Sequence, residues 1–295
     1  MPSANEFVNL TELHRLAVDI AREAGVIQTS RLHLERTIDT KSTSTDAVTE
    51  VDRACEDLIV RRILEARPDD SILGEEGASR QGTSSLRWVI DPLDGTVNYV
   101  YRRGDFAVSL GIEMDLGSGA APVVGVVHDP SLDETFSAIR SRPPIPTVDG
   151  KRAPISTFAD GLEDAVGAWL NGERIHVNAV ADLGQSLVGT GFGYDPEVRR
   201  AQGAMLAQIV PHVRDIRRAG SAALDLCAVA CGRLDGYFER GLQPWDSAAA
   251  ALIVEEAGGI AERLDSPEVP AGTWVVAGPG IFEALRTRVV AASQP

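Results

Sequence analysis

Long apolar runs and paired cysteines are scarce in this sequence. The longest wholly apolar run, residues 248–254, is far too short to cross a bilayer, and the first residues show no basic segment followed by an apolar one. The three cysteines (Cys55, Cys227 and Cys231) lack a CxxC spacing, which favours free thiols in a reducing compartment over a disulfide framework. We therefore expect a soluble, unexported protein of the cytoplasm, with no membrane partner.

Positive charge is also sparse: 28 Lys and Arg residues stand against 43 Asp and Glu residues, which gives a formal net charge of -15. Phosphate backbones are bound by concentrated positive charge, so no nucleic-acid partner is expected. The chain also lacks the GxxxxGK[ST], HExxH and GxSxG motifs of three common enzyme classes. What remains is an excess of carboxylates, most of which serve solvation while some are candidates for binding divalent cations.

Apolar periodicity and turn signals predict alternating helices and strands, which indicate a layered α/β fold. A chain of 295 residues holds one large or two closely packed domains, and we divide it into an N-terminal half, residues 1–182, and a C-terminal half, residues 183–295. Asn171-Gly172 predicts a type I′ hairpin, and residues 141–164 are expected to be an inserted surface loop. Helices are expected at residues 11 to the low thirties, 49–66, 196–210, 221–231, 245–256 and 280–290, and strands at residues 71–74, 86–90, 106–113, 123–127, 134–139, 186–189, 234–239 and 273–276 and near residue 215.

Three acidic clusters are candidates for a metal site: Gly74-Glu75-Glu76-Gly77, Asp91-Pro92-Leu93-Asp94-Gly95-Thr96, and Glu239 with Trp245-Asp246. The first two follow predicted strands, and strand ends are where open α/β sheets commonly place their chemistry. In the second cluster Pro92 restricts the backbone between two carboxylates, so that several oxygens point to one place. Hard cations such as Mg²⁺ prefer clustered oxygen ligands. Taken alone, the hexapeptide also fits an Asp-rich turn.

In this order and spacing, the clusters resemble the inositol monophosphatase family of metal-dependent, lithium-sensitive phosphatases. The family's hallmarks are a Gly-Glu-Glu strand end, an Asp-Pro-x-Asp-Gly-Thr/Ser loop and a later Trp-Asp-x-Ala helix start, which is Trp245-Asp246-Ser247-Ala248 here. The resemblance extends from the first helix to Gly259 or beyond. It implies the αβαβα sandwich of the inositol monophosphatase and fructose-1,6-bisphosphatase type.

The resemblance also implies a metal site and a catalytic group. Two to three Mg²⁺ ions would be held by the carboxylates of Glu75, Asp91, Asp94 and Asp246 and by the carbonyl of Leu93. Converging carboxylates repel one another strongly unless dications neutralise them, so this set is physically consistent. Thr96, oriented by Asp52, would act with Glu75 to position and deprotonate the attacking water.

On the substrate side, the resemblance implies contacts from Asp94, Gly95, Thr96, the Ala222 backbone, Glu239 and Asp246. Glu239 also fits a second interpretation, as an exposed strand-end acid. Lys41 fits either the rim of the metal cluster or the solvated surface. Gly189-Thr-Gly191-Phe-Gly193 looks like a phosphate-binding loop, but it lacks a third glycine at the dinucleotide spacing, so we interpret it as an ordinary turn.

The implied activity is hydrolysis of myo-inositol 1-phosphate and related sugar-alcohol phosphates in a homodimer, with fructose 1,6-bisphosphate as a side activity. Histidinol phosphate is the alternative substrate, because the phosphatases that use it share nearly every metal residue. An alternative of another class is a protein-binding factor in transcription complexes, a role of some bacterial relatives. The main departure from the family pattern is the loop at residues 141–164, which does not affect the metal ligands.

Overall fold

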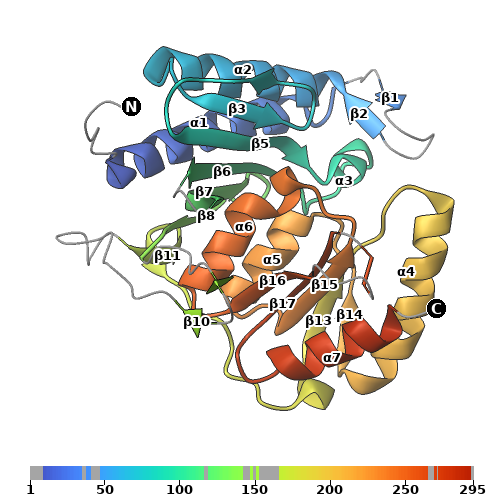
Figure 1. The fold of residues 1–295 in the computed structure, drawn as a ribbon. Coiled ribbons are helices and arrows are strands. Elements are labelled where there is room, and N and C mark those ends of the chain that lie inside the picture. Colours follow the sequence, from blue (N-terminus) through green and yellow to red (C-terminus); the bar gives the residue numbers. More distant parts are fainter. Residues whose placement is uncertain are drawn as a thin grey trace.

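Helices and sheets alternate in five layers in the computed structural model of this chain (Figure 1). The structure describes residues 9–34, 38–40, 47–115, 119–141, 147–148, 151–152, 166–264, 269–270 and 272–293. From the top of Figure 1, the layers are a helix pair, a sheet, a second helix pair, a second sheet and a third helix pair. The αβαβα sandwich that the family resemblance implies is therefore present.

The first helix layer consists of α1 (Leu10–Arg31) and α2 (Glu50–Ala66), which both begin at side-chain caps. Asn9 caps α1, and Thr49 and Asp52 form a capping box at the start of α2. The pair covers one face of a mixed eight-stranded sheet. Its strands, in spatial order, are β12 (Glu173–Arg174), β11 (Gly167–Leu170), β8 (Glu134–Ile139), β7 (Ala120–Asp129), β6 (Ala107–Asp115), β5 (Leu86–Asp94), β3 (Ser71–Gly74) and β4 (Ser79–Arg80).

The second sheet belongs to the C-terminal half of the chain. Its strands, in spatial order, are β14 (Asp215–Arg217), β13 (Leu187–Thr190), β15 (Gly236–Arg240), β17 (Thr273–Ala277) and β16 (Ile260–Leu264). β13 is parallel to β14 and β15, whereas β17 is antiparallel to β15 and β16. Two helices, α5 (Ala222–Ala230) and α6 (Pro244–Glu256), lie between the sheets, and α4 (Pro196–Ile209) and α7 (Phe282–Ala292) form the outer layer.

The two faces of the first sheet contact different helices. Alternate side chains of β6, such as Val108 and Leu110, are fully buried in the core beneath α1 and α2. On the other face, the cross-strand pair Gly111 and Gly125 has no side chains, and α6 lies directly against it. A Cβ atom at Gly125 would lie 2.5 Å from the Ala249 carbonyl oxygen. These glycines therefore allow α6 to approach the sheet closely.

Short elements complete the described fold. They are α3 (Thr96–Val100), the ribbon of β1 (Ile38–Thr40) and β2 (Ala47–Thr49), the ribbon of β9 (Thr147–Val148) and β10 (Lys151–Arg152), and 3-10 turns at Leu183–Gln185 and Val210–His212. No helix in the ranges given above is long and apolar enough to cross a membrane.

Most predicted elements are present, with differences at particular places. Asn171 and Gly172 connect β11 to β12 with φ angles of 50° and 85°, and a type I′ turn requires φ above zero at both positions. The strand predicted at residues 86–90 continues to Asp94, and the sequence patterns indicate neither β16 nor α3. Most of the surface loop predicted at residues 141–164 lies outside the described residues.

Candidate active site

β5 holds both aspartates of the central acidic cluster. Asp91 pairs with Ser109 and Asp94 with Ala107, so β5 has one more residue than β6 between these points, which is a β-bulge. The prediction that Asp91 follows the strand is wrong, because pairing with β6 continues past the bulge to Asp94. Residues three apart in a regular strand point to opposite faces. The bulge changes this alternation and re-aims the two carboxylates.

Gly95 and Thr96 end this cluster and begin α3. Gly95 has a φ of 87°, and a Cβ atom there would lie 2.6 Å from a backbone carbonyl oxygen, so the turn requires glycine. Thr96 Oγ1 lies 3.1 Å from Asp52 Oδ1 and 3.0 Å from the Leu93 carbonyl oxygen. The other Asp52 oxygen accepts hydrogen bonds from the N–H and O–H groups of Thr49. The start of α2 thus fixes Asp52 beside Thr96.

Glu75 lies directly after β3, next to the β5 cluster. β3 and β5 are parallel, and the Glu75 N–H donates to the Ile90 carbonyl at 3.1 Å. Glu56 of α2 fixes the following turn: one of its oxygens accepts the Glu76 N–H at 3.1 Å and the other accepts the Ala78 N–H at 3.2 Å. Burial raises the pKa of Glu56 in spite of these hydrogen bonds. No sequence motif points to Glu56, because its position depends on how α2 packs.

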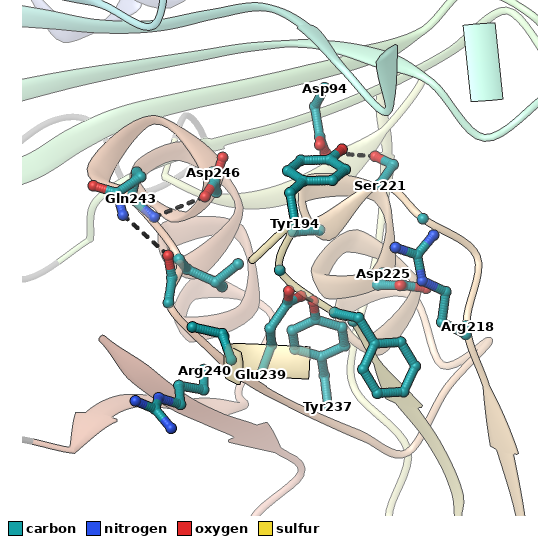
Figure 2. Close-up of a pocket in the computed structure, with 18 of the residues that line it drawn as sticks. Asp94, Tyr194, Arg218, Ser221, Asp225, Tyr237, Glu239, Arg240, Gln243 and Asp246 are labelled. Atoms are coloured by element: carbon teal, nitrogen blue, oxygen red, sulfur yellow. Dashed lines mark hydrogen bonds between the residues drawn. The ribbon is translucent and has the colours of Figure 1, made fainter. Parts of the chain in front are cut away.

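Asp94 connects the first sheet to the C-terminal half. Its Oδ2 accepts hydrogen bonds from the Ser221 O–H at 2.6 Å and the Ala223 N–H at 2.8 Å (Figure 2). Ser221 is also the N-cap of α5, and the Ala222 N–H donates to Asp94 as well. The predicted substrate-binding backbone at Ala222 therefore holds Asp94 in this structure.

Asp246 lies in the first turn of α6. Its Oδ2 accepts the Gln243 N–H at 2.7 Å, which forms a capping box. The Ser109 O–H of β6 donates to the Trp245 carbonyl at 3.3 Å, so this turn is linked to the first sheet. Asp246 lines the same cavity as Glu75 and Asp94.

The carboxylates of Glu75, Asp91, Asp94 and Asp246 affect one another's charge. Burial raises the pKa of Asp91 well above its usual range, and the three other carboxylates raise it further. Burial also raises the pKa of Asp246, and it raises that of Asp94 to about 6 although the hydrogen bonds from α5 act in the opposite direction. A divalent cation relieves such repulsion, so this donor set suits one chemically. Across the described ranges no group of three or more His, Cys, Asp or Glu side chains is already arranged to hold a metal ion.

A cavity of about 490 Å³ opens beside these acids. Figure 2 shows Asp94 and Asp246 at the top of this cavity and Tyr237 and Glu239 at the bottom. We call the first group, with Glu75 and the buried Asp91, the carboxylate end. Asp225, Tyr237 and Glu239 form the far end, which belongs to α5 and β15.

Glu239 of the far end is held by a neighbour on the same strand. The Tyr237 O–H donates a hydrogen bond to Glu239 Oε2. Burial raises the pKa of Glu239 to about 7, while the Tyr237 hydrogen bond and the charge of Arg218 act in the opposite direction. Asp225 is 4% exposed, and burial raises its pKa to about 8. The interpretation of Glu239 as an exposed strand-end acid is wrong, because Glu239 lines the cavity and is only partly exposed.

Comparison with known proteins identifies the family of this chain. The model of the inositol monophosphatase family matches residues 9–294. The chain belongs to this family. An inositol-1-monophosphatase from Mycobacterium leprae is 42% identical over 252 residues, which cover 83% of this chain and 78% of the relative. A protein named Nus factor SuhB from Pasteurella multocida is 35% identical over 93% of this chain and 94% of its own length.

A solved structure gives the same result. The extragenic suppressor protein suhB from Bartonella henselae superposes with a TM-score of 0.79 at 29% identity, and the match covers 94% of this chain and 98% of that chain. Membership of the inositol monophosphatase family makes this protein a phosphatase of a generally metal-dependent family, with a small phosphorylated substrate.

The residues that sequence reasoning missed lie mostly at the far end. Gly189 lies in β13, and Gly191 lines the cavity, so the interpretation of residues 189–193 as an ordinary turn is wrong. Asp225 has a visible signal, because it is the charged residue of the otherwise apolar α5. Tyr194 also lines the cavity and has no sequence signal. Lys41 lies outside the described residues.

Proposed function

We propose that this chain is a Mg²⁺-dependent phosphomonoesterase that hydrolyses myo-inositol 1-phosphate and related sugar-alcohol phosphates. One arrangement supports the proposal: the mutually repelling carboxylate end and the polar far end face a single cavity of about 490 Å³. The carboxylate end suits cations that bind a phosphate group. The far end offers acceptors for the hydroxyl groups of a sugar alcohol.

The metal ligands in this proposal are the carboxylates of Glu75, Asp91, Asp94 and Asp246 and the carbonyl of Leu93, for two to three Mg²⁺ ions. When bound, the ions would lower the pKa of the attacking water, neutralise the phosphate oxygens and stabilise the leaving alkoxide.

The attacking water would be oriented and deprotonated by Thr96, Asp52 and Glu75. Asp52 accepts the Thr96 hydroxyl hydrogen at 3.1 Å, which leaves the Thr96 oxygen able to accept a hydrogen bond from the water. Glu75 would take the proton of the water as general base. Gly95 supports this group, because its left-handed turn sets where Thr96 begins α3.

The alcohol part of the substrate would contact Glu239 at the far end, Asp94 and Asp246 at the carboxylate end, and Ala222, which also lines the cavity. A partly buried carboxylate can accept hydrogen bonds from two neighbouring hydroxyl groups. This arrangement favours a polyol over an alcohol with a single hydroxyl group.

Phosphate release tests the proposal. Myo-inositol 1-phosphate, histidinol phosphate and fructose 1,6-bisphosphate are supplied side by side, with Mg²⁺ and then with added Li⁺. Preference for the inositol ester and inhibition by Li⁺ are expected. Preference for histidinol phosphate would leave the proposed metal ligands unchanged and contradict the proposed substrate. If folded, Mg²⁺-loaded protein released no phosphate from any of the esters, the proposed phosphatase activity would be contradicted.

A second candidate function, binding of a protein in a transcription complex, is favoured by the relative named Nus factor SuhB. The net charge of -15 suits a partner with a basic surface. Affinity capture with wild type and Asp94→Asn tests this role. A specific partner retained by both proteins would support binding that is independent of catalysis, and the absence of any retained partner would contradict it.

We further propose that the protein is a homodimer in the cytoplasm. Each chain would consist of two halves, residues 1–182 and 183–295. All strands of the first sheet lie within residues 71–174 and those of the second within residues 187–277, which supports this division. Cys55, Cys227 and Cys231 are free thiols, which suits a reducing compartment. Analytical ultracentrifugation tests the dimer, and a species with the mass of one chain would contradict it.

A further inference from the structure

Two glycines of β13 and its extension lie against the far end of the cavity. β13 and β15 are parallel, and Gly189 pairs with Tyr237. A Cβ atom at Gly189 would lie 2.9 Å from Tyr237 Cδ2, and one at Gly191 would overlap Glu239 Oε2. Gly189 and Gly191, the glycine pair, therefore leave room for the tyrosine ring and for the carboxylate. This explains the glycine-rich motif that the proposed phosphate chemistry does not use.

Several contacts fix the arrangement around the glycine pair. Tyr237 is 0% exposed, and its O–H donates to Glu239 Oε2. Figure 2 shows the Tyr237 ring below Glu239 with its hydroxyl turned toward the carboxylate. The Thr190 O–H donates to the Phe238 carbonyl at 2.9 Å and locks the two strands together. The Glu239 carboxylate is thus confined by the Tyr237 hydroxyl and by the backbone at Gly191, and Glu239 lines the cavity.

We propose that Tyr237 is a positioning residue that holds Glu239 for recognition of a hydroxyl-bearing leaving group. This inference rests on the proposed function and names what selects the alcohol. A carboxylate that is already fixed loses less conformational freedom when it binds a hydroxyl group. Without the Tyr237 O–H, the carboxylate can rotate away from the cavity. Tyr237 and the glycine pair thereby set specificity by holding Glu239 in place.

Kinetics of Tyr237→Phe on two esters test this role. Myo-inositol 1-phosphate has hydroxyl groups on its leaving group, whereas the leaving group of p-nitrophenyl phosphate has no further hydroxyl to recognise. We expect KM for the inositol ester to rise about tenfold, as for one weakened hydrogen bond to a charged group. This hydrogen bond stabilises the bound substrate and the transition state equally, so kcat should stay within about twofold of wild type. The kinetics on p-nitrophenyl phosphate stay unchanged.

A double variant shows whether Tyr237 acts through Glu239. Glu239→Gln alone should also raise KM for the inositol ester, and adding Tyr237→Phe should raise it no further. Tyr99→Phe is the matched control, because Tyr99 is also 0% exposed and donates its O–H to the Gln28 carbonyl at 2.8 Å, away from the cavity. Any loss in this control should affect both esters equally.

The outcomes separate this inference from the proposed function. The positioning role would be overturned if Tyr237→Phe raised KM equally for both esters, or if the increases in KM added up in the double variant. In either case, a wild type that prefers the inositol ester would still uphold the proposed function. A wild type that hydrolyses p-nitrophenyl phosphate without preferring the inositol ester would overturn both. A selective wild type with a selective loss in Tyr237→Phe supports both.

Discussion

The two ends of the cavity are built in different ways. At the carboxylate end, Asp91 and Asp94 belong to one hexapeptide, and Glu75 follows the neighbouring strand. At the far end, Glu239 is held by Tyr237, while Gly189 of β13 and Gly191 just beyond it leave room for the Tyr237 ring and the Glu239 carboxylate. The end proposed for chemistry is therefore encoded in short contiguous motifs. The end proposed to choose the substrate depends on pairing between distant segments.

The comparison predicts that damage to the carboxylate end affects every substrate. Asp94→Asn removes a charge from the proposed metal site. Even the loss of a group that only hydrogen-bonds to a metal ligand lowers metal affinity or activity by about 10- to 100-fold. We expect phosphate release to fall by more than about a hundredfold on both the inositol ester and p-nitrophenyl phosphate. Circular dichroism should show an unchanged fold. Turnover near that of wild type would refute the assignment of Asp94.

Mg²⁺ should stabilise the protein through the carboxylate end alone. A cation that binds only the folded state adds about 2.7 kcal/mol to the free energy of unfolding at a concentration of 100 times its Kd. Thermal unfolding with EDTA and with Mg²⁺ measures this gain. We expect Asp94→Asn to lose most of it and Tyr237→Phe to retain it. Equal gains in both variants would mean that the cation binds elsewhere.

A single methyl group should damage the far end without changing any charge. In Gly191→Ala the added Cβ overlaps the Glu239 carboxylate, which must move. We expect KM for the inositol ester to rise about tenfold, the equivalent of one lost hydrogen bond to a charged group, with p-nitrophenyl phosphate unaffected.

Gly203→Ala in α4 is the control for this methyl group, because a Cβ atom there meets nothing within 4 Å. Alanine also favours a helix interior over glycine, so this variant should keep its selectivity and gain stability. A loss of selectivity in the control would show that any change in the C-terminal half disturbs the far end.

The far end should also lower stability at alkaline pH. Burial raises the pKa of Asp225 to about 8, whereas an unfolded aspartate titrates near about 3.9. The folded state therefore binds the extra proton, and wild-type stability falls as pH rises from about 4 to about 8. We expect Asp225→Asn to be more stable by at least about 1 kcal/mol at pH 9, and the gain to vanish at pH 4. Urea unfolding in EDTA checks this, and a gain independent of pH would contradict it.

The same contrast explains how far the sequence predicts the structure. The Thr49–Asp52 cap of α2 and the Asn171-Gly172 turn use local chemistry, and each is recognisable from a few neighbouring residues. The carboxylates of the candidate site lie in motifs of the same local kind. β16 is not indicated because its burial alternates poorly, and α3 is only Thr96–Val100.

Tertiary contacts account for what the sequence did not indicate in the site. Glu56 holds the turn after Glu75 from a helix, and Ser221 holds Asp94 from the other half of the chain. The β-bulge at Asp91 depends on the pairing of β5 with β6. Neither periodicity nor motif spacing reports contacts between residues that are far apart along the chain.

The position of α6 between the sheets has a consequence for how the protein is made. Ser109 of β6 and the Trp245 carbonyl of α6 are in contact although 136 positions separate them. On a ribosome, the Gly111 and Gly125 face of the first sheet is synthesised long before the helix that covers it. Contacts of such long range form late and slowly. We therefore expect refolding chains to regain helix content before they regain activity.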